Sequence, residues 1–381
     1  MKKVSIFSKM DKPLFIMCIL YSIVGVIMVL SASNVSAVLS YKESPYYFFI
    51  RQCIFVFGAY LMGLFIILRM PLYKYKKLVS LGVLFILGTL IFLLINGKVM
   101  SGAKSWIDFK FFTFQPSEFA KTFIILYLAC RYSTIKKFKN ISDVFLPMIP
   151  CIIVFFLVAL EPDLGTACLI AIICMFIFFA LPLSKDKNMK ILRIVTVIAA
   201  IGGILFLNFN SDILTSTQAS RFNFKDPCSR YLEESGYQVC NGYIAIHNGG
   251  LFGVGLGAST QKYLYLPAAH TDFIFAIITE ELGLIGGGCV LIAYIFLLFR
   301  ILVIARNATN LRNSIIAFGT FAYILSHITI NLGGLLAIIP LTGVPLPFLS
   351  YGGSFMINLM ILVSLTQRVA IETKRKKQLE Y

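Results

Sequence analysis

The sequence predicts an all-α polytopic membrane protein with about ten transmembrane helices and both termini in the cytoplasm. Hydrophobic residues make up 59% of its 381 residues and charged residues only 13%, and the mean hydropathy is +0.86. An ordinary soluble domain is about 25% charged. The chain therefore has too few charges to cover a surface in contact with water, which excludes the soluble, disordered and fibrous classes.

Ten apolar runs account for the predicted spans. A helix needs about 20 apolar residues to cross about 30 Å of hydrocarbon, and the fourth and last runs are short and polar at their outer ends. An even number of spans puts both termini on one side of the membrane. The runs cover residues 14–30, 48–68, 78–95, 115–130, 144–160, 165–181, 191–206, 273–299, 314–339 and 355–365.

The positions of the basic residues indicate which side is cytoplasmic. The two termini and the loops on their side hold 24 of the 34 Lys and Arg but only five of the 17 acidic residues. Because basic residues concentrate on the cytoplasmic side, both termini are predicted to lie there, with a basic tail at 366–381. The positive charge thus reflects topology and lipid contact. No nucleic-acid partner is expected, because the basic residues form no separate domain.

The chain is expected to form a single transmembrane domain, residues 1–381, with one large extracytoplasmic loop at 208–271 between spans seven and eight. Seven of the nine cysteines lie in apolar runs, as expected for small buried hydrophobic residues. Cys228 and Cys240 lie in the outer loop, where a disulfide is chemically permitted. Their spacing alone leaves the pairing open.

Ionisable residues at a membrane boundary are costly and usually functional, and the first candidates are Glu118 and Lys121. Pro116 suits the first turn of a helix, and the two charged residues are three positions apart on one face. They can form an ion pair that lets both charges lie near the membrane. Alternatively, the carboxylate and the ammonium group line a cavity that opens outward.

The second candidate is Asp163, in a tight turn between two spans. Asp is a favoured residue at a helix N-terminus, so Asp163 is expected to cap the next helix. Capping does not exclude a second role at the outer surface.

The third candidate is Asp272, at the outer end of a long apolar run. Thr271 can cap the helix, which places Asp272 in the first turn, ionised and directed at an outer cavity. We therefore favour a functional role for Asp272. Glu280 and Glu281 follow about two turns later, and a structural ion pair or buried hydrogen bonding is expected for them.

The fourth candidate is the segment 340–354, in which three prolines exclude a regular helix. Non-helical backbone near a membrane is tolerated where it is buried or lines a wet cavity. The segment, which includes Ser350, is expected to shape a site without supplying an acid or a base.

The fifth candidate is a set of cations expected on the outer side. Several cations around one outward cavity would suit an anionic group such as a pyrophosphate. The set consists of Arg51, Lys104, Arg221 and Lys262, together with Lys121.

Taken together, these residues resemble the SEDS family (shape, elongation, division and sporulation) of bacterial peptidoglycan glycosyltransferases over nearly the whole chain. The similarity includes Gln-Pro-Ser-Glu at 115–118, Glu-Pro-Asp-Leu-Gly-Thr at 161–166 and His-Thr-Asp-Phe at 270–273. Residues 102–107, 236–238 and 342–354 extend it. The segments 253–259 and 261–267 are more similar to the FtsW division branch than to the RodA elongation branch.

The resemblance implies that the chain polymerises lipid II, a disaccharide-pentapeptide on undecaprenyl pyrophosphate, at the outer face of the bacterial cytoplasmic membrane. It implies that Asp272 is the essential carboxylate and general base, and that Glu118, Lys121 and Asp163 also match positions needed for activity. A divalent cation, Mg²⁺ or Mn²⁺, is implied by the resemblance only. So are a class B penicillin-binding protein and other divisome membrane proteins as partners, and a location at the division septum.

Three alternatives remain beside this interpretation. One is a lipid II flippase, which would need polar residues through the full bilayer thickness rather than in its outer third. Another is a polymerase of the elongation or sporulation branch. The last is a non-catalytic scaffold for a penicillin-binding protein, in which Asp272 would be replaceable by Asn.

Overall fold

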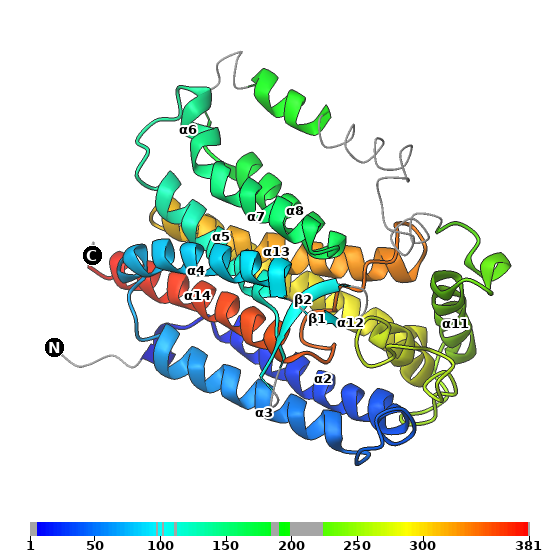
Figure 1. Cartoon of the computed structure of the whole chain (residues 1–381). Coiled ribbons are helices and arrows are strands. Elements are labelled where there is room, and N and C mark those ends of the chain that lie inside the picture. Colours follow the sequence, from blue (N-terminus) through cyan, green and yellow to red (C-terminus); the bar gives the residue numbers. More distant parts are fainter. Residues whose placement is uncertain are drawn as a thin grey trace.

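The computed structural model describes residues 6–96, 98–100, 103–109, 113–183, 190–198 and 224–379. These residues form a helical bundle in which the N- and C-terminal ends of the chain lie at the same end (Figure 1). Lys374 Nζ donates a hydrogen bond to Met10 O at 2.9 Å and so joins the two ends. The polytopic all-helical fold predicted from composition is confirmed.

The helices follow one another along the chain with short connections, apart from the outer segments. The longer helices are α2 (Lys12–Leu39), α3 (Tyr47–Met62, continued by a π-helical turn at Gly63–Ile67), α4 (Tyr75–Asn96), α5 (Pro116–Tyr132), α7 (Ile149–Leu160), α8 (Leu164–Ala180), α11 (Glu234–Gly249), α12 (Ile274–Asn307), α13 (Leu311–Leu335) and α14 (Gly353–Lys377). The short ones are α1 (Ile6–Lys9), α6 (Ile141–Phe145) and the 3₁₀ turns Leu72–Lys74, Leu146–Met148 and Pro227–Arg230.

Seven helices within the described part of the chain are long and apolar enough to cross a membrane. Helices α5 and α8 have 17 residues each and pack against α13. Of the predicted span at 191–206, only 191–198 lie among the described residues, and these are helical. The number ten therefore stays a prediction. The seven are α2, α3 with its π-helical turn, α4, the segment Ile141–Leu160, α12, α13 and α14.

Helix α14 is longer than its apolar run at 355–365, because its polar residues are bonded inside the bundle. Gln367 exchanges two 2.9 Å hydrogen bonds with the backbone of Asp11. Arg368 Nη1 donates to Leu68 O at 2.7 Å. Polar side chains in a span are tolerated when protein groups satisfy them. The helix therefore continues past the point where hydropathy alone ends it.

Two outer segments predicted as loops contain regular structure. Between α4 and α5 lies a three-stranded antiparallel sheet of β1 (Lys98–Met100), β2 (Ala103–Asp108) and β3 (Thr113–Phe114), in the order β1-β2-β3. The described part of the 208–271 loop contains α11, and a disulfide joins Cys228 to Cys240 with a Cα–Cα distance of 4.9 Å. Residues 208–223 of this loop lie outside the described residues.

Helix α12 is broken at Gly283, where φ is 75°. The backbone of 250–255 supplies the hydrogen bonds lost at the break: Leu284 N and Ile285 N donate to Gly250 O and Leu251 O. Val254 N and Gly255 N in turn donate to the backbone carbonyls of Glu280 and Glu281, just before the break. A Cβ on Gly283 would lie 2.2 Å from Leu251 O, so only glycine fits this crossing.

Candidate functional site

A cavity of about 710 Å³ lies among the outer segments of the bundle. Its wall comes from the end of α2, strand β2, the start of α5, the turn between α7 and α8, residues 262–272 and parts of 342–355. Three of the predicted carboxylates, Asp272, Glu118 and Asp163, line this single cavity. Segments far apart in the sequence thus bring three of the predicted site residues to one cavity.

Asp272 lies in the turn before α12, not in its first helical turn as predicted. The helix begins at Ile274, and Thr271 Oγ1 donates to Ala268 O at 3.1 Å instead of capping it. The backbone holds Asp272 in place, since Asn331 Nδ2 donates to Asp272 O at 2.8 Å. The same amide group donates to Val344 O at 2.8 Å. Asn331 therefore joins the Asp272 turn to the 340–354 segment.

The 340–354 segment is irregular and lines the cavity, as its prolines predicted. Gly343 has a φ of 71°, and a Cβ there would lie 3.2 Å from Asp272 Oδ2. Glycine thus satisfies the backbone conformation and leaves room beside the carboxylate. Ser350 lies behind the wall: its Oγ donates to Thr271 O at 2.6 Å and accepts from Leu346 N at 2.8 Å.

Asp163 caps α8, as predicted, and also faces the cavity. Its Oδ1 accepts from Thr166 N at 3.0 Å, which satisfies one of the free amides of the first turn. Its Oδ2 accepts from Gln115 Nε2 at 3.1 Å. These two bonds fix the carboxylate at the cavity wall.

Glu118 and Lys121 form a buried ion pair of 2.7 Å, with exposed fractions of 3% and 0%. The glutamate lines the cavity, whereas the lysine lies behind it. Pro345 O can only accept, so His327 Nδ1, 3.1 Å away, carries the proton. His327 Nε2 is then free to accept from Lys121 Nζ at 3.3 Å. Tyr323 Oη lies 3.4 Å from the second oxygen of Glu118.

Among the side chains that the structure describes, the predicted outer cations do not gather around the cavity. Lys262 lines the cavity, but its ammonium group is paired with Glu281 at 3.3 Å. The guanidinium group of Arg51 lies 4.3 Å from the centre of the Tyr47 ring, outside the cavity wall. Lys104 belongs to β2, and its side chain lies outside the described part of the structure, as does all of Arg221.

The sequence prediction assigned no role to three residues of this region, namely Glu161, His327 and Asn331. Both carboxylate oxygens of Glu161 are buried without a hydrogen-bond partner among the described residues. Burial, with a smaller effect of the nearby Asp163 charge, raises the pKa of Glu161 to about 8. His327 was detectable as the one histidine inside an apolar run. The role of Asn331 gives no signal in the sequence, because it depends on which loops pack together.

His270 lines the cavity and packs against the rings of Phe48 and Tyr351, and burial lowers the pKa of its imidazole to about 4. Because the unfolded chain would take up a proton near pH 6.5, stability should fall as the pH decreases from about 6.5 to 4. The His270→Phe variant keeps the ring packing but cannot titrate. When the pH decreases from about 6.5 to 4, this variant should lose up to about 3 kcal/mol less stability than wild type. Thermal unfolding across this pH range measures the difference. Parallel curves for the two proteins would contradict the prediction.

The fold and the cavity define a multi-pass membrane protein with three carboxylates on the wall of one cavity. Residues 11–375 match the FtsW/RodA/SpoVE family of cell cycle proteins, and the chain belongs to this family.

Individual relatives agree with the family match. The chain is 37% identical over 374 residues to the probable peptidoglycan glycosyltransferase FtsW of Bacillus subtilis, covering 93% of this chain and 90% of the relative. It is 34% identical to the stage V sporulation protein E of the same organism, over 94% and 96% of the two chains.

Solved structures share the fold at 22% identity. The rod shape determining protein RodA of Thermus thermophilus superposes with a TM-score of 0.67, covering 95% of this chain and 96% of that one. A chain of a peptidoglycan synthase complex superposes with a TM-score of 0.74, covering 96% and 98%.

Proposed function

We propose that the protein is a peptidoglycan glycosyltransferase that polymerises lipid II at the outer face of the bacterial cytoplasmic membrane. The observation that carries the proposal is the placement of Asp272 on the wall of the outer cavity, with Gly343 leaving space beside its carboxylate. The names of the curated relatives support the same reaction class.

In the proposed reaction, Asp272 accepts the proton of the acceptor sugar's 4-hydroxyl group. The hydroxyl oxygen forms a bond to the anomeric carbon of the lipid-linked donor, and the bond from that carbon to the pyrophosphate oxygen breaks. Undecaprenyl pyrophosphate leaves with the bonding electrons. A positioned base of this kind contributes about 10²–10⁴-fold to the rate. The cavity would hold the two sugars in place for the transfer.

The negative charge on the leaving pyrophosphate needs compensation, and Lys121 and Lys262 are already paired with carboxylates. Within the described residues, no group of three or more His, Cys, Asp or Glu side chains could hold a metal ion by itself. Mg²⁺ is usually bound by one or two carboxylates together with substrate phosphates. Asp163, on the same cavity wall, supplies such a carboxylate, and a divalent cation held there together with the substrate phosphates would offset the charge of the pyrophosphate.

We further propose that a class B penicillin-binding protein is the partner and that the complex acts with other divisome membrane proteins at the septum. A chain of a peptidoglycan synthase complex shares the fold, which supports a partnered enzyme. The similarity to FtsW proteins, of which the Bacillus subtilis relative is 37% identical, supports the division branch.

The test is glycan-strand synthesis from purified lipid II in liposomes, with the partner present and its transpeptidase blocked. We expect polymer in buffer containing Mg²⁺ and much less after chelation with EDTA. The control is the partner alone. If the complex makes no polymer but moves lipid II across the bilayer, the protein is a flippase. If it only activates its partner, it is a scaffold.

A further inference from the structure

Two adjacent glutamates close the base of the loop that carries Asp272. Ser259 Oγ donates to Glu280 Oε2, and Thr260 donates from its amide and its hydroxyl to Glu280 Oε1 at 3.1 and 2.8 Å. Ser259 and Glu280 are 21 residues apart in the chain. Asp272 lies between them in the sequence, so these bonds close a loop that contains it.

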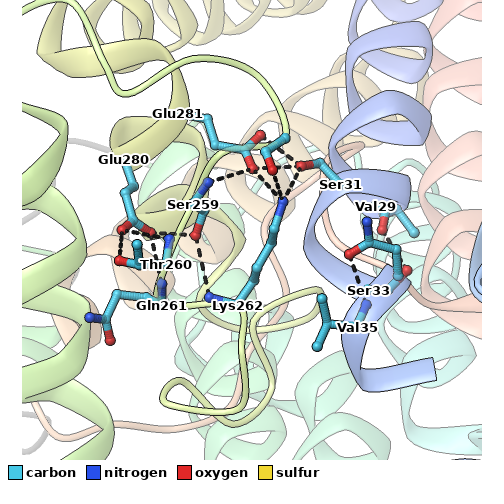
Figure 2. Close-up of polar contacts among 12 residues, drawn as sticks. Val29, Ser31, Ser33, Val35, Ser259, Thr260, Gln261, Lys262, Glu280 and Glu281 are labelled. Carbon is cyan, nitrogen blue, oxygen red and sulfur yellow. Dashed lines mark hydrogen bonds and ion pairs between the residues drawn. The ribbon is translucent and has the colours of Figure 1, made fainter. Parts of the chain in front are cut away.

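Glu281 makes a second closure beside the first. Its Oε1 lies 3.3 Å from Lys262 Nζ, and Ser31 Oγ of α2 donates to its two oxygens at 2.6 and 2.8 Å. Lys262 Nζ also donates to Gly257 O. Figure 2 shows Glu280 directed at residues 259–261 and Glu281 directed at Lys262, Ser31 and the amide of Ser259. We call these contacts the loop latch, formed by Ser31, Ser259, Thr260, Lys262, Glu280 and Glu281.

The charged groups of the latch are buried, with exposed fractions of 0% for Glu280, 1% for Glu281 and 2% for Lys262, whereas Thr260 is exposed. Desolvating an ion pair costs about as much as its attraction returns, so a buried pair is weak evidence for stability. Such pairs can instead select one conformation among several. The enclosed charges therefore suit a device that fixes the position of a segment.

The segment that the latch closes forms much of the cavity wall. Leu264 and the residues from Leu266 to Asp272 line the cavity. Leu264 and Ala268 have φ values of 68° and 55°, which non-glycine residues keep only when their surroundings enforce them. The far end of the segment is held by Asn331 and Ser350, as described above. The latch supplies the restraint at the near end.

We propose that the loop latch is a positioning device, which holds the 263–272 segment so that Asp272 meets the acceptor hydroxyl. The role in turnover rests on the proposed function. Glu280 and Glu281 do not line the cavity, so they act on the reaction through the segment rather than by touching substrate. A displacement of about 1 Å at the reacting atoms can cost about 10²-fold in rate.

The experiment compares Glu280→Gln and Glu281→Gln with wild type in the lipid II assay and in hydrogen exchange of the intact protein. We expect kcat to fall about 10- to 100-fold, with KM for lipid II within about threefold. Amide exchange should rise in residues 263–272 and stay unchanged in α13 and α14. The matched control is Arg300→Gln, which breaks the 2.5 Å pair with Asp11 at the other end of the bundle and should leave kcat and this exchange unchanged.

Two results would overturn the proposal. One is unchanged exchange in 263–272 in both glutamine variants. The other is a rise in KM at constant kcat, which would assign the glutamates to substrate binding. If wild type makes no polymer, the proposed function falls, and the exchange measurement then decides alone whether the latch holds the segment.

Discussion

Asp272→Asn should reduce glycan-strand synthesis by at least about 10²-fold and up to about 10⁴-fold, the contribution of a positioned general base. The amide has nearly the same shape as the carboxylate, so it preserves the packing beside Gly343. It is not basic enough to accept the proton of a sugar hydroxyl. The measurement is initial polymerisation rate from lipid II, by the complex with the partner's transpeptidase blocked.

The control for this loss is Asp108→Asn, in the outer sheet and outside the cavity wall. Both variants should unfold at the temperature of wild type and bind the partner equally. Polymer at the wild-type rate from Asp272→Asn would remove this residue from the chemistry. A loss of partner binding in that variant would instead assign the effect to assembly.

Lys121→Met should destabilise the protein by about 3–5 kcal/mol, because it leaves Glu118 buried without its ion-pair partner. The methionine fills most of the lysine's volume, so lost packing contributes little. His327 also loses the donor to its Nε2. Thermal unfolding in detergent at neutral pH measures the effect, and the variant should melt well below wild type.

The matched double variant Lys121→Met with Glu118→Gln separates charge from packing. It removes both charges and should recover most of the lost stability, since no buried charge remains unpaired. The two single substitutions are then strongly non-additive, as expected for residues in direct contact. A double variant that loses the sum of the two single effects would show that the pair is not coupled.

The membrane fold and much of the cavity wall could be predicted from the sequence, because both depend on local signals. Apolar runs define spans, three prolines exclude a helix in 340–354, and Asp163 has a cap's position before α8. The structural role expected for Glu280 and Glu281 is confirmed by their buried bonds. These residues were interpretable because an ionised group inside an apolar segment needs a partner.

The remaining features depend on contacts between distant segments. Lys262 was expected among the cations for a pyrophosphate, but its ion-pair partner Glu281 lies on α12 and binds it inside the protein. Thr271 bonds Ala268 rather than the helix it was expected to cap. Polar residues of α14 ended its predicted span early, because hydropathy does not show that their partners, Asp11 and Leu68, lie at the ends of distant helices. Hydropathy and capping rules contain no information on such partners.

The break at Gly283 has a consequence for how the protein is made. The amides of Leu284 and Ile285, just after the break, donate to Gly250 O and Leu251 O, and an unsatisfied backbone group in lipid costs several kcal/mol. They become satisfied only when the 250–255 backbone docks beside them. Ser31 of α2 likewise lies 250 residues upstream of Glu281 in the chain. A nascent chain can therefore insert its early spans, but it cannot complete the cavity wall until the ribosome has synthesised the segment from residue 250 to residue 285.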